Sequence, residues 1–216
     1  MNTQNQHLDT LHDIKKMMER SSRFISLSGL SGIAAGCCAL IGAWFASKII
    51  NDHGAARGYD DTAYAYRGGS IATTELLGNS LIQVAACTFM AAFILSFVFT
   101  YLRSKKTGTP IWGPSSQRLM VNFCMPLFVG GIFLIKLLEH GTYGLIAPGC
   151  LIFYGLALVN ASKYTFGEVR YLGYGQIMLG IINLWFVGCG LYFWAAGFGL
   201  LHIVYGAMMW WKYERN

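Results

Sequence analysis

Long apolar segments alternate with short polar ones along most of the chain. Three uncharged runs stand out, with 24 residues from Phe24 to Ser47, 27 from Leu76 to Leu102 and 41 from Tyr171 to Trp211. A helix of about 20 apolar residues crosses a bilayer, so each run suffices for one crossing and the third for two. The pattern therefore predicts an all-α fold, a polytopic membrane helix bundle.

Six transmembrane helices account for the whole pattern. Four glycines lie near the middle of the 41-residue run, namely Gly188, Gly190, Gly197 and Gly199. They indicate that the run divides into two helices. The predicted spans are residues 24–47, 76–101, 119–138, 143–161, 171–190 and 193–211. We therefore expect a single membrane domain over residues 1–216, with one long outer loop over 51–74.

Residues 1–23 are expected to form an amphipathic cytoplasmic lead. Leu8, Leu11 and Met18 recur at three-to-four-residue spacing or its multiples, which is typical of a helix lying on a membrane surface. Docking of a cytoplasmic partner is the alternative interpretation of this lead.

The distribution of basic residues predicts the orientation, because Lys and Arg concentrate in cytoplasmic loops. Twelve of the 16 fall on one side of the six predicted spans, and the other side has Lys48, Arg57, Arg67 and Lys136. An even number of spans puts both termini on the side with twelve, so we expect both the N and C termini in the cytoplasm. The formal net charge of +6 is then a topology signal, and we expect no nucleic-acid partner.

Composition agrees with a membrane protein and argues against a soluble enzyme. The chain is 55% hydrophobic and 12% charged, whereas soluble domains have about 25% charged residues. It contains no phosphate-binding, zinc-protease or serine-hydrolase motif, no C-x-x-C pair and no histidines at i, i+4 spacing. We therefore expect no catalytic residue, no metal and no cofactor. The sequence favours a protein that is not an enzyme.

Ionisable and amide side chains within the spans are the candidate ligand-binding residues, because such groups are costly in a bilayer. One group of three shares a face in the outer half of the second span, and another shares a face at the outer end of the third. Two further residues lie near the middle of the fifth and sixth spans. The predicted set is Glu75, Asn79, Gln83, Lys136, Glu139, His140, Asn183 and His202.

Two interpretations of this set stay open. If the two outer groups meet, the outer leaflet holds a polar pocket for a small polar or amphipathic ligand. Alternatively, Lys136 reaches the headgroups and pairs with Glu139, while Glu75 lies in water at a helix N-terminus, where the helix dipole favours a carboxylate. His202 is too deep to reach water in this way, and for it a hydrogen bond to Asn183 that merely joins two helices is the alternative to a functional role.

These observations predict a binding, sensing or regulatory membrane protein, with membrane lipids and a small polar or lipid-like ligand as partners. A small transporter or channel and an intramembrane lipid-modifying enzyme are the alternatives. Gly32 and Gly36 form a small-xxx-small pair that serves either packing within the chain or a homo-oligomer. Residues 119–164 and 168–213 share eight identities over 46 aligned positions, which indicates two similar helical hairpins.

One segment resembles known proteins. The stretch from Glu19 to Gly32 reads ERSSRFISLSGLSG and resembles the opening of a group of bacterial six-span membrane proteins of the Bacteroidota type. The resemblance implies a multi-pass protein of a bacterial cell (inner) membrane, and it implies no particular activity.

Overall fold

The computed structural model describes residues 28–57, 80–108 and 112–215, and all regular elements in these ranges are helical. Predictions for residues 1–23, for Glu75 and Asn79, and for most of the loop 51–74 lie outside the described residues. The long helices are α2 (Gly29–Arg57), α4 (Ser80–Thr107), α5 (Pro114–Glu139), α6 (Ile146–Ala161), α7 (Val169–Trp185) and α9 (His202–Tyr213). Shorter elements are η1 (Tyr143–Leu145), η2 (Ser162–Tyr164), η3 (Val187–Cys189), α8 (Gly190–Trp194) and the π-helix η4 (Ala195–Leu201).

The predicted membrane character is confirmed at the level of its helices. Five segments are long and apolar enough to cross a bilayer, namely Gly29–Asp52, Ser80–Thr107, Pro114–Glu139, Tyr143–Tyr164 and Val187–Tyr213. Helix α7 has 17 residues, the lower end of the range of about 17–25 that a crossing needs. The all-α fold is thus confirmed, with five to six helices able to span a membrane.

Several helices extend past the predicted limits of their spans. Helix α2 continues to Arg57, ten residues beyond residue 47, and α4 continues from within its span to Thr107. Helix α5 begins at Pro114, five residues before the predicted start, because proline favours the first helical turn. The end of an apolar run marks where the chain reaches water. A helix continues past that point when no helix-breaking residue follows.

The division of the last apolar run was predicted in the wrong place. Helix α7 ends at Trp185, and the chain turns at Phe186, where φ is −121° and ψ is 58°. The amide of Asn183 donates a hydrogen bond to the Phe186 carbonyl oxygen at 2.9 Å, which stabilises this turn. Gly188 lies in η3 just after the turn, whereas Gly197 and Gly199 lie inside η4 and mark a different irregularity.

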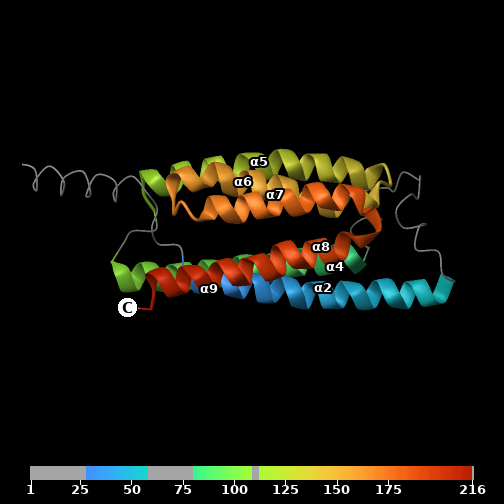
Figure 1. The fold of residues 1–216 in the computed structure, drawn as a ribbon, viewed down its shortest axis with the longest axis horizontal. Helices are drawn as coiled ribbons and strands as arrows, with labels where there is room; N and C mark the ends of the chain where they lie inside the picture. Colours follow the sequence, from blue (N-terminus) through green and yellow to red (C-terminus); the bar gives the residue numbers. More distant parts are fainter. Residues whose placement is uncertain (1–27, 58–79, 109–111, 216) are drawn as a thin grey trace, which may run out of the picture.

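The helices form two layers (Figure 1). Helix α6 packs against α5 and α7 in one layer, and α2 packs against α4 and α9 in the other. The layers meet where α8 and η4 contact α6 and α7. The two hairpins expected to be similar therefore differ, because α5 and α6 lie side by side whereas α7 and α9 belong to different layers.

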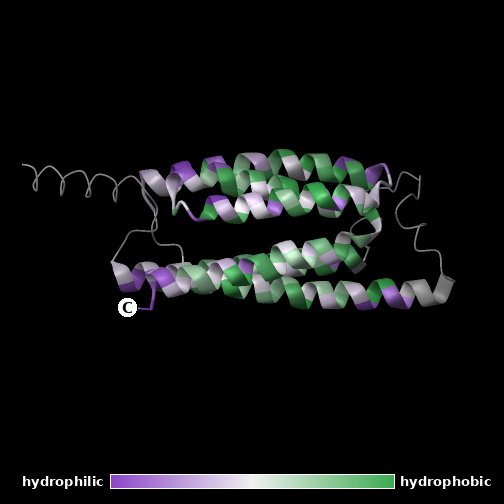
Figure 2. Ribbon diagram, viewed as in Figure 1, coloured by the Kyte–Doolittle hydropathy of each residue, from purple (hydrophilic) through white to green (hydrophobic). Residues whose placement is uncertain are grey.

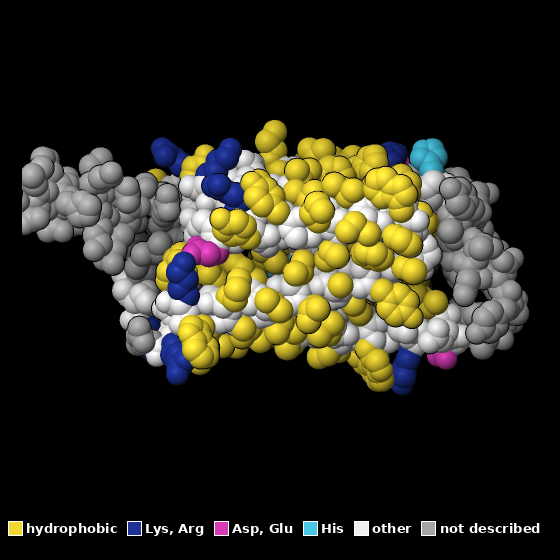
Figure 3. All heavy atoms as spheres, viewed as in Figure 1, with side chains coloured by type: hydrophobic (Ala, Val, Ile, Leu, Met, Phe, Trp, Pro, Cys, Tyr) yellow, Lys and Arg dark blue, Asp and Glu magenta, His cyan; other side chains and the backbone are white. Residues whose placement is uncertain are grey.

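An apolar belt covers the middle of the bundle on the face shown in Figures 2 and 3, and charged groups lie at its two ends. Helix α4 contributes Phe89, Phe93 and Phe97 to this belt, each more than half exposed. The end of the bundle that carries the end of α9 is called the basic end here. Its described basic residues are Arg103, Lys105, Lys106, Arg118, Lys163, Arg170, Lys212 and Arg215.

Glycines bring helix backbones into direct contact within each layer. Between α2 and α9, a Cβ added to Gly206 would lie 2.6 Å from the Gly29 carbonyl oxygen. Between α6 and α7, a Cβ on Gly155 would lie 2.7 Å from the Gly173 oxygen, and one on Gly173 would lie 2.8 Å from the Gly155 oxygen. Gly32 and Gly36 face α9 and η4 in the same way, so this pair serves packing within the chain.

We predict that Gly155→Ala destabilises the protein by about 1–3 kcal/mol, because the new methyl group would push the backbones of α6 and α7 apart. Gly131→Ala is the matched control, since no atom lies within 4 Å of its added Cβ. Thermal unfolding in detergent should show a clear fall in Tm for the first variant and none for the second. Equal Tm values would contradict the glycine contact.

Candidate functional site

Three buried polar side chains lie on α7 and at the start of α9. Gln176 and Asn183 have no exposed surface, and His202 is 6% exposed. Gln176 and Asn183 are seven residues apart, about two helical turns, so both lie on one face of α7. His202 is near the middle of the last membrane-spanning segment.

The π-helix η4 supplies a backbone acceptor at this depth. A π-helix shifts the register of backbone hydrogen bonds, and such insertions are frequent at functional sites. The carbonyl oxygen of Gly197 accepts hydrogen bonds from Gln176 Nε2 at 2.8 Å and from His202 Nδ1 at 3.0 Å. A Cβ on Gly197 would lie 2.6 Å from Gln176 Oε1, so the absence of a side chain is what lets the amide approach.

The hydrogen bonds assign one tautomer to His202. A carbonyl oxygen only accepts, so Nδ1 carries the proton and Nε2 of the neutral ring is an acceptor. Tyr154 then donates its hydroxyl proton to Nε2 across 2.8 Å. Gln176 Nε2 is 3.4 Å from Nδ1, but both atoms are donors in this arrangement and the Gln176 proton goes to Gly197. Tyr154, Gln176, Gly197 and His202 are called the polar cluster below.

The orientations of the two buried amides are fixed by backbone carbonyls. The NH₂ group of Gln176 donates to the Gly197 carbonyl oxygen, and that of Asn183 donates to the Phe186 carbonyl oxygen. The side-chain oxygen of each amide therefore takes no part in these bonds. Among the described residues, four buried side-chain atoms have no hydrogen-bond partner, namely Gln176 Oε1, Asn183 Oδ1, Tyr143 Oη and Tyr205 Oη. A buried polar atom left in this state costs about 1–3 kcal/mol.

Aromatic rings enclose the polar cluster. Phe198 stacks on His202 with ring centroids 6.0 Å apart, and it contacts the Tyr154 ring at 5.0 Å. Trp194 packs against Phe198 with ring centroids 5.2 Å apart. The hydrogen bonds of the cluster join neutral groups, so the site offers hydrogen bonding and aromatic surface without a formal charge.

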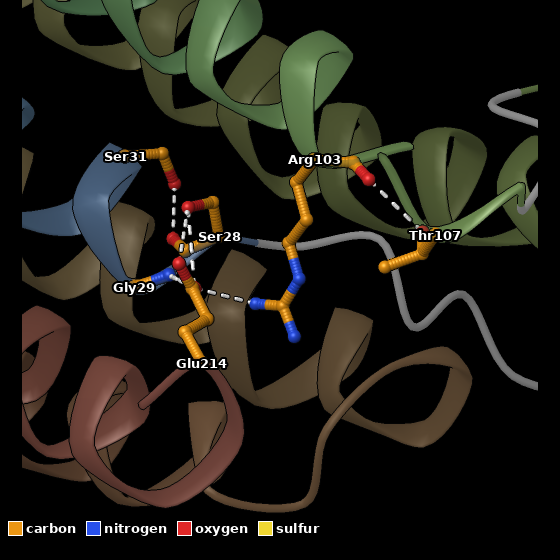
Figure 4. Close-up of polar contacts among 6 residues, drawn as sticks. All are labelled: Ser28, Gly29, Ser31, Arg103, Thr107 and Glu214. Atoms are coloured by element: carbon orange, nitrogen blue, oxygen red, sulfur yellow. Dashed lines mark hydrogen bonds and ion pairs between the residues drawn. The ribbon is translucent and has the colours of Figure 1, made fainter. Parts of the chain in front are cut away.

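A second polar group, the Glu214 clasp, joins three helices at the basic end (Figure 4). Glu214, just after α9, accepts hydrogen bonds from the Ser28 hydroxyl at 3.2 Å and from the Gly29 N–H at the start of α2. Arg103 of α4 donates to the same carboxylate at 2.6 Å, and both charged side chains are about 13–14% exposed. The carboxylate therefore caps α2 and neutralises Arg103 together.

Glu168 forms a link between the layers at the same end. It precedes α7, and its Oε1 accepts hydrogen bonds from Lys212 at 2.5 Å and from the Tyr213 hydroxyl at 2.8 Å. Burial tends to raise the pKa of Glu168, but the hydrogen bonds from Lys212 and Tyr213 outweigh burial and hold its pKa below the usual value. The Tyr213 ring also packs against Phe166 in a tilted arrangement, with ring centroids 4.6 Å apart.

The predicted site residues do not assemble into one group in the described part. Lys136 pairs with Glu139 at 2.7 Å, with the lysine side chain 65% exposed, and His140 is exposed beside them. Gln83 is exposed on α4, which packs on α2, whereas these three residues belong to the end of α5, which packs on α6. Glu75 and Asn79 lie outside the described residues.

His202 and Asn183 are buried, as expected for residues in mid-span. They do not bond each other, which was the alternative considered from the sequence. The ring of His202 bonds Tyr154 and Gly197, and Asn183 bonds Phe186. The sequence analysis missed Gln176 and Tyr154. For Gln176, the seven-residue spacing from Asn183 on one apolar helix indicated a shared polar face. For Tyr154, no spacing in the sequence pointed to His202.

Comparison with known proteins identifies no relative, because the sequence matches no protein family and no curated protein or solved structure is significantly similar to it. The function is therefore inferred from the side chains of the site.

We predict that Glu214→Gln lowers the free energy of unfolding by about 1–3 kcal/mol, because the substitution removes the carboxylate to which Arg103 donates in a site where both side chains are mostly buried. Glu139→Gln is the matched control, since its ion pair with Lys136 is exposed and worth less than about 1 kcal/mol. Denaturation in detergent micelles would measure both, and a control variant as unstable as Glu214→Gln would contradict the role of the clasp.

Glu168 should make stability depend on acid pH. Its pKa is lower in the folded protein, so its stabilising effect is present above the unfolded pKa of about 4.3 and is lost as pH falls through the folded value. We expect the wild-type Tm to fall more steeply than that of Glu168→Gln as the pH is lowered from about 5. Parallel Tm curves for the two proteins would contradict the shift.

Proposed function

We propose that the protein is a six-span protein of a bacterial inner membrane with its basic end in the cytoplasm. The excess of Lys and Arg at the basic end supports this orientation. Cation–aromatic pairs at both ends match the two headgroup levels, with Lys48 4.3 Å from the Trp44 ring and Arg215 4.1 Å from the Trp211 ring. Ser28 and Glu214 contact each other, so the start of α2 and the end of α9 lie on one side.

Within that frame, we propose that the protein binds a small neutral ligand at the polar cluster and acts as a receptor or sensor in the membrane. The observation that carries the proposal is Gln176 Oε1, an acceptor with no exposed surface and no partner among the described residues. It lies beside a histidine of fixed tautomer and a carbonyl oxygen presented by a π-helix.

The chemistry of the cluster defines the ligand class. A free amide oxygen requires a hydrogen-bond donor, so the ligand carries a hydroxyl or an N–H group. The neutral partners of His202 favour an uncharged molecule, because burying an ion without a counter-charge is costly. The rings of Phe198 and Trp194 add an apolar surface for the rest of the ligand. A hydroxylated or amide-containing amphipathic molecule fits these requirements.

This proposal moves the site from the outer leaflet to the middle of the bilayer. The exposed pair of Lys136 and Glu139 then serves to anchor the outer end of α5 at the headgroups. The buried residues of α6, α7 and α9 take the binding role.

The proposal predicts that a hydroxyl- or amide-bearing molecule co-purifies with the wild-type protein in mild detergent and is lost from Gln176→Leu. Native mass spectrometry with analysis of the released compounds would measure this. Asn160→Leu is the control, since Asn160 is an amide of α6 that bonds Asn122 outside the cluster. An identical set of bound molecules in wild type and Gln176→Leu, with both proteins folded, would rule out binding at the cluster.

A further inference from the structure

Positive charge is concentrated at the basic end and is only partly neutralised there. The described acidic residues of this end are Glu168 and Glu214, and they pair with Lys212 and Arg103. The remaining basic side chains have no carboxylate partner among the described residues, and they are Lys105, Lys106, Arg118, Lys163, Arg170 and Arg215. Figure 3 shows Lys and Arg side chains gathered at this end of the layer formed by α5, α6 and α7. The basic end therefore presents an excess of positive charge to its surroundings.

Two of these basic residues, Arg118 of α5 and Lys163 of η2, come from neighbouring elements. Asn160 of α6 donates a hydrogen bond through Nδ2 to the Asn122 carbonyl oxygen at 2.9 Å, which joins α6 to α5. The same nitrogen is 3.3 Å from Asn122 Oδ1. Element η2 directly follows α6 and also packs against α5. The segments that carry the two cations are thus held side by side.

The directions of the two helices put Arg118 and Lys163 at one level, because α5 begins at the basic end and α6 ends there (Figure 1). Arg118 is four residues before Asn122, whose side-chain amide donates to the Arg118 carbonyl oxygen at 2.8 Å. Lys163 is three residues after Asn160. At about 1.5–2.0 Å per residue, both cations lie roughly 6 Å from the bond between the asparagines, toward the basic end. These spacings also keep each cation on the helix face of its asparagine, next to the seam between α5 and α6.

Arg118 lies at the level of the lipid headgroups. It is exposed, and it is eighteen positions from Lys136 near the outer end of α5. This separation corresponds to about 27 Å along a helix, close to the apolar thickness of a bilayer of about 30 Å. On the membrane side of Arg118, α5 exposes the apolar side chains of Met120, Val121 and Met125. The two cations therefore border both water and a surface that acyl chains can cover.

We propose that Arg118 and Lys163 bind the phosphate group of an anionic phospholipid in the leaflet at the basic end. The guanidinium group of Arg118 can donate two parallel hydrogen bonds to a phosphate, and the Lys163 ammonium group adds a second positive charge from the neighbouring element. A zwitterionic headgroup fits less well, because its own ammonium group would lie beside two cations. The acyl chains of the lipid lie against the exposed apolar side chains of α5.

The surroundings of the two cations favour a lipid over a soluble phosphate compound. Water and salt screen exposed charges, so two exposed cations alone hold a soluble anion only weakly. A phospholipid adds the contact of its acyl chains with α5, and its phosphate is already confined to the level of Arg118. The lipid site uses the outside of α5 and α6 and shares no residue with the polar cluster, so it does not depend on the ligand proposed there.

The test is native mass spectrometry of the full chain in a neutral detergent, titrated with phosphatidylglycerol or with phosphatidylcholine of the same acyl chains. We expect the first phosphatidylglycerol to bind about tenfold more tightly than phosphatidylcholine. Arg118→Gln combined with Lys163→Gln should weaken phosphatidylglycerol binding about tenfold or more, since each basic residue near an anionic headgroup contributes about fivefold. Lys105→Gln combined with Lys106→Gln is the matched control, because it removes the same charge from α4 at the same end and should change binding less than about twofold.

Equal losses in the two double variants would overturn the site, because the preference would then belong to the overall charge of the basic end. Displacement of phosphatidylglycerol by an equal concentration of glycerol phosphate, which has no acyl chains, would overturn the assignment to a lipid. Arg118→Lys keeps the charge and removes only the guanidinium group, and it should weaken binding severalfold. Gln176→Leu should leave phosphatidylglycerol binding unchanged, so the lipid site and the polar cluster can each fail without the other.

Discussion

Backbone contact at glycines holds this bundle together. In a bilayer the lipid tails are as apolar as the helix surfaces, so burial of apolar area gives little drive for one helix to choose another. Close approach of helices with small residues supplies dispersion contacts that lipid cannot replace. The seam between α2 and α9 and that between α6 and α7 are of this kind, and each stabilises one of the two layers.

The polar cluster depends on the same close approach. The Gly197 carbonyl can approach Gln176 because Gly197 has no side chain. The π-helix shifts the register of the backbone hydrogen bonds, so this carbonyl oxygen is open to side-chain donors. The layers share the cluster, with Tyr154 and Gln176 from one and Gly197 and His202 from the other. Hydrogen bonds between the layers therefore lie midway along the helices, and the ion pair of Glu168 with Lys212 joins the layers again at the basic end.

Hydropathy predicted the helical fold, because the bilayer imposes a length on every apolar segment, whereas the orientation inferred from the basic residues stays a prediction. Hydropathy could not place the end of α7, since glycine signals both a turn and a close contact. Gly197 and Gly199 look like turn residues in the sequence and are contact residues in η4. The outer polar group stays a prediction, since Glu75 and Asn79 lie outside the described residues; spacing shows which residues share a helix face, whereas the neighbour of that face is set by packing. His202 was identified from its depth alone, and its partner Tyr154 depends on how α6 meets α9.

The pairing of α2 with α9 also sets the order of assembly. The first described helix makes its glycine contacts with the last one, and the carboxylate that caps it comes from Glu214, more than 180 positions later in the chain. During synthesis the glycine face of α2 therefore lacks α9, and the Gly29 N–H lacks the Glu214 carboxylate, until the final helix has formed. Contacts this distant in sequence form slowly. The hairpin of α5 and α6 and its neighbour α7 have no such delay, so the layer they form can pack while the ribosome is still at work, and it offers a surface on which the other layer closes.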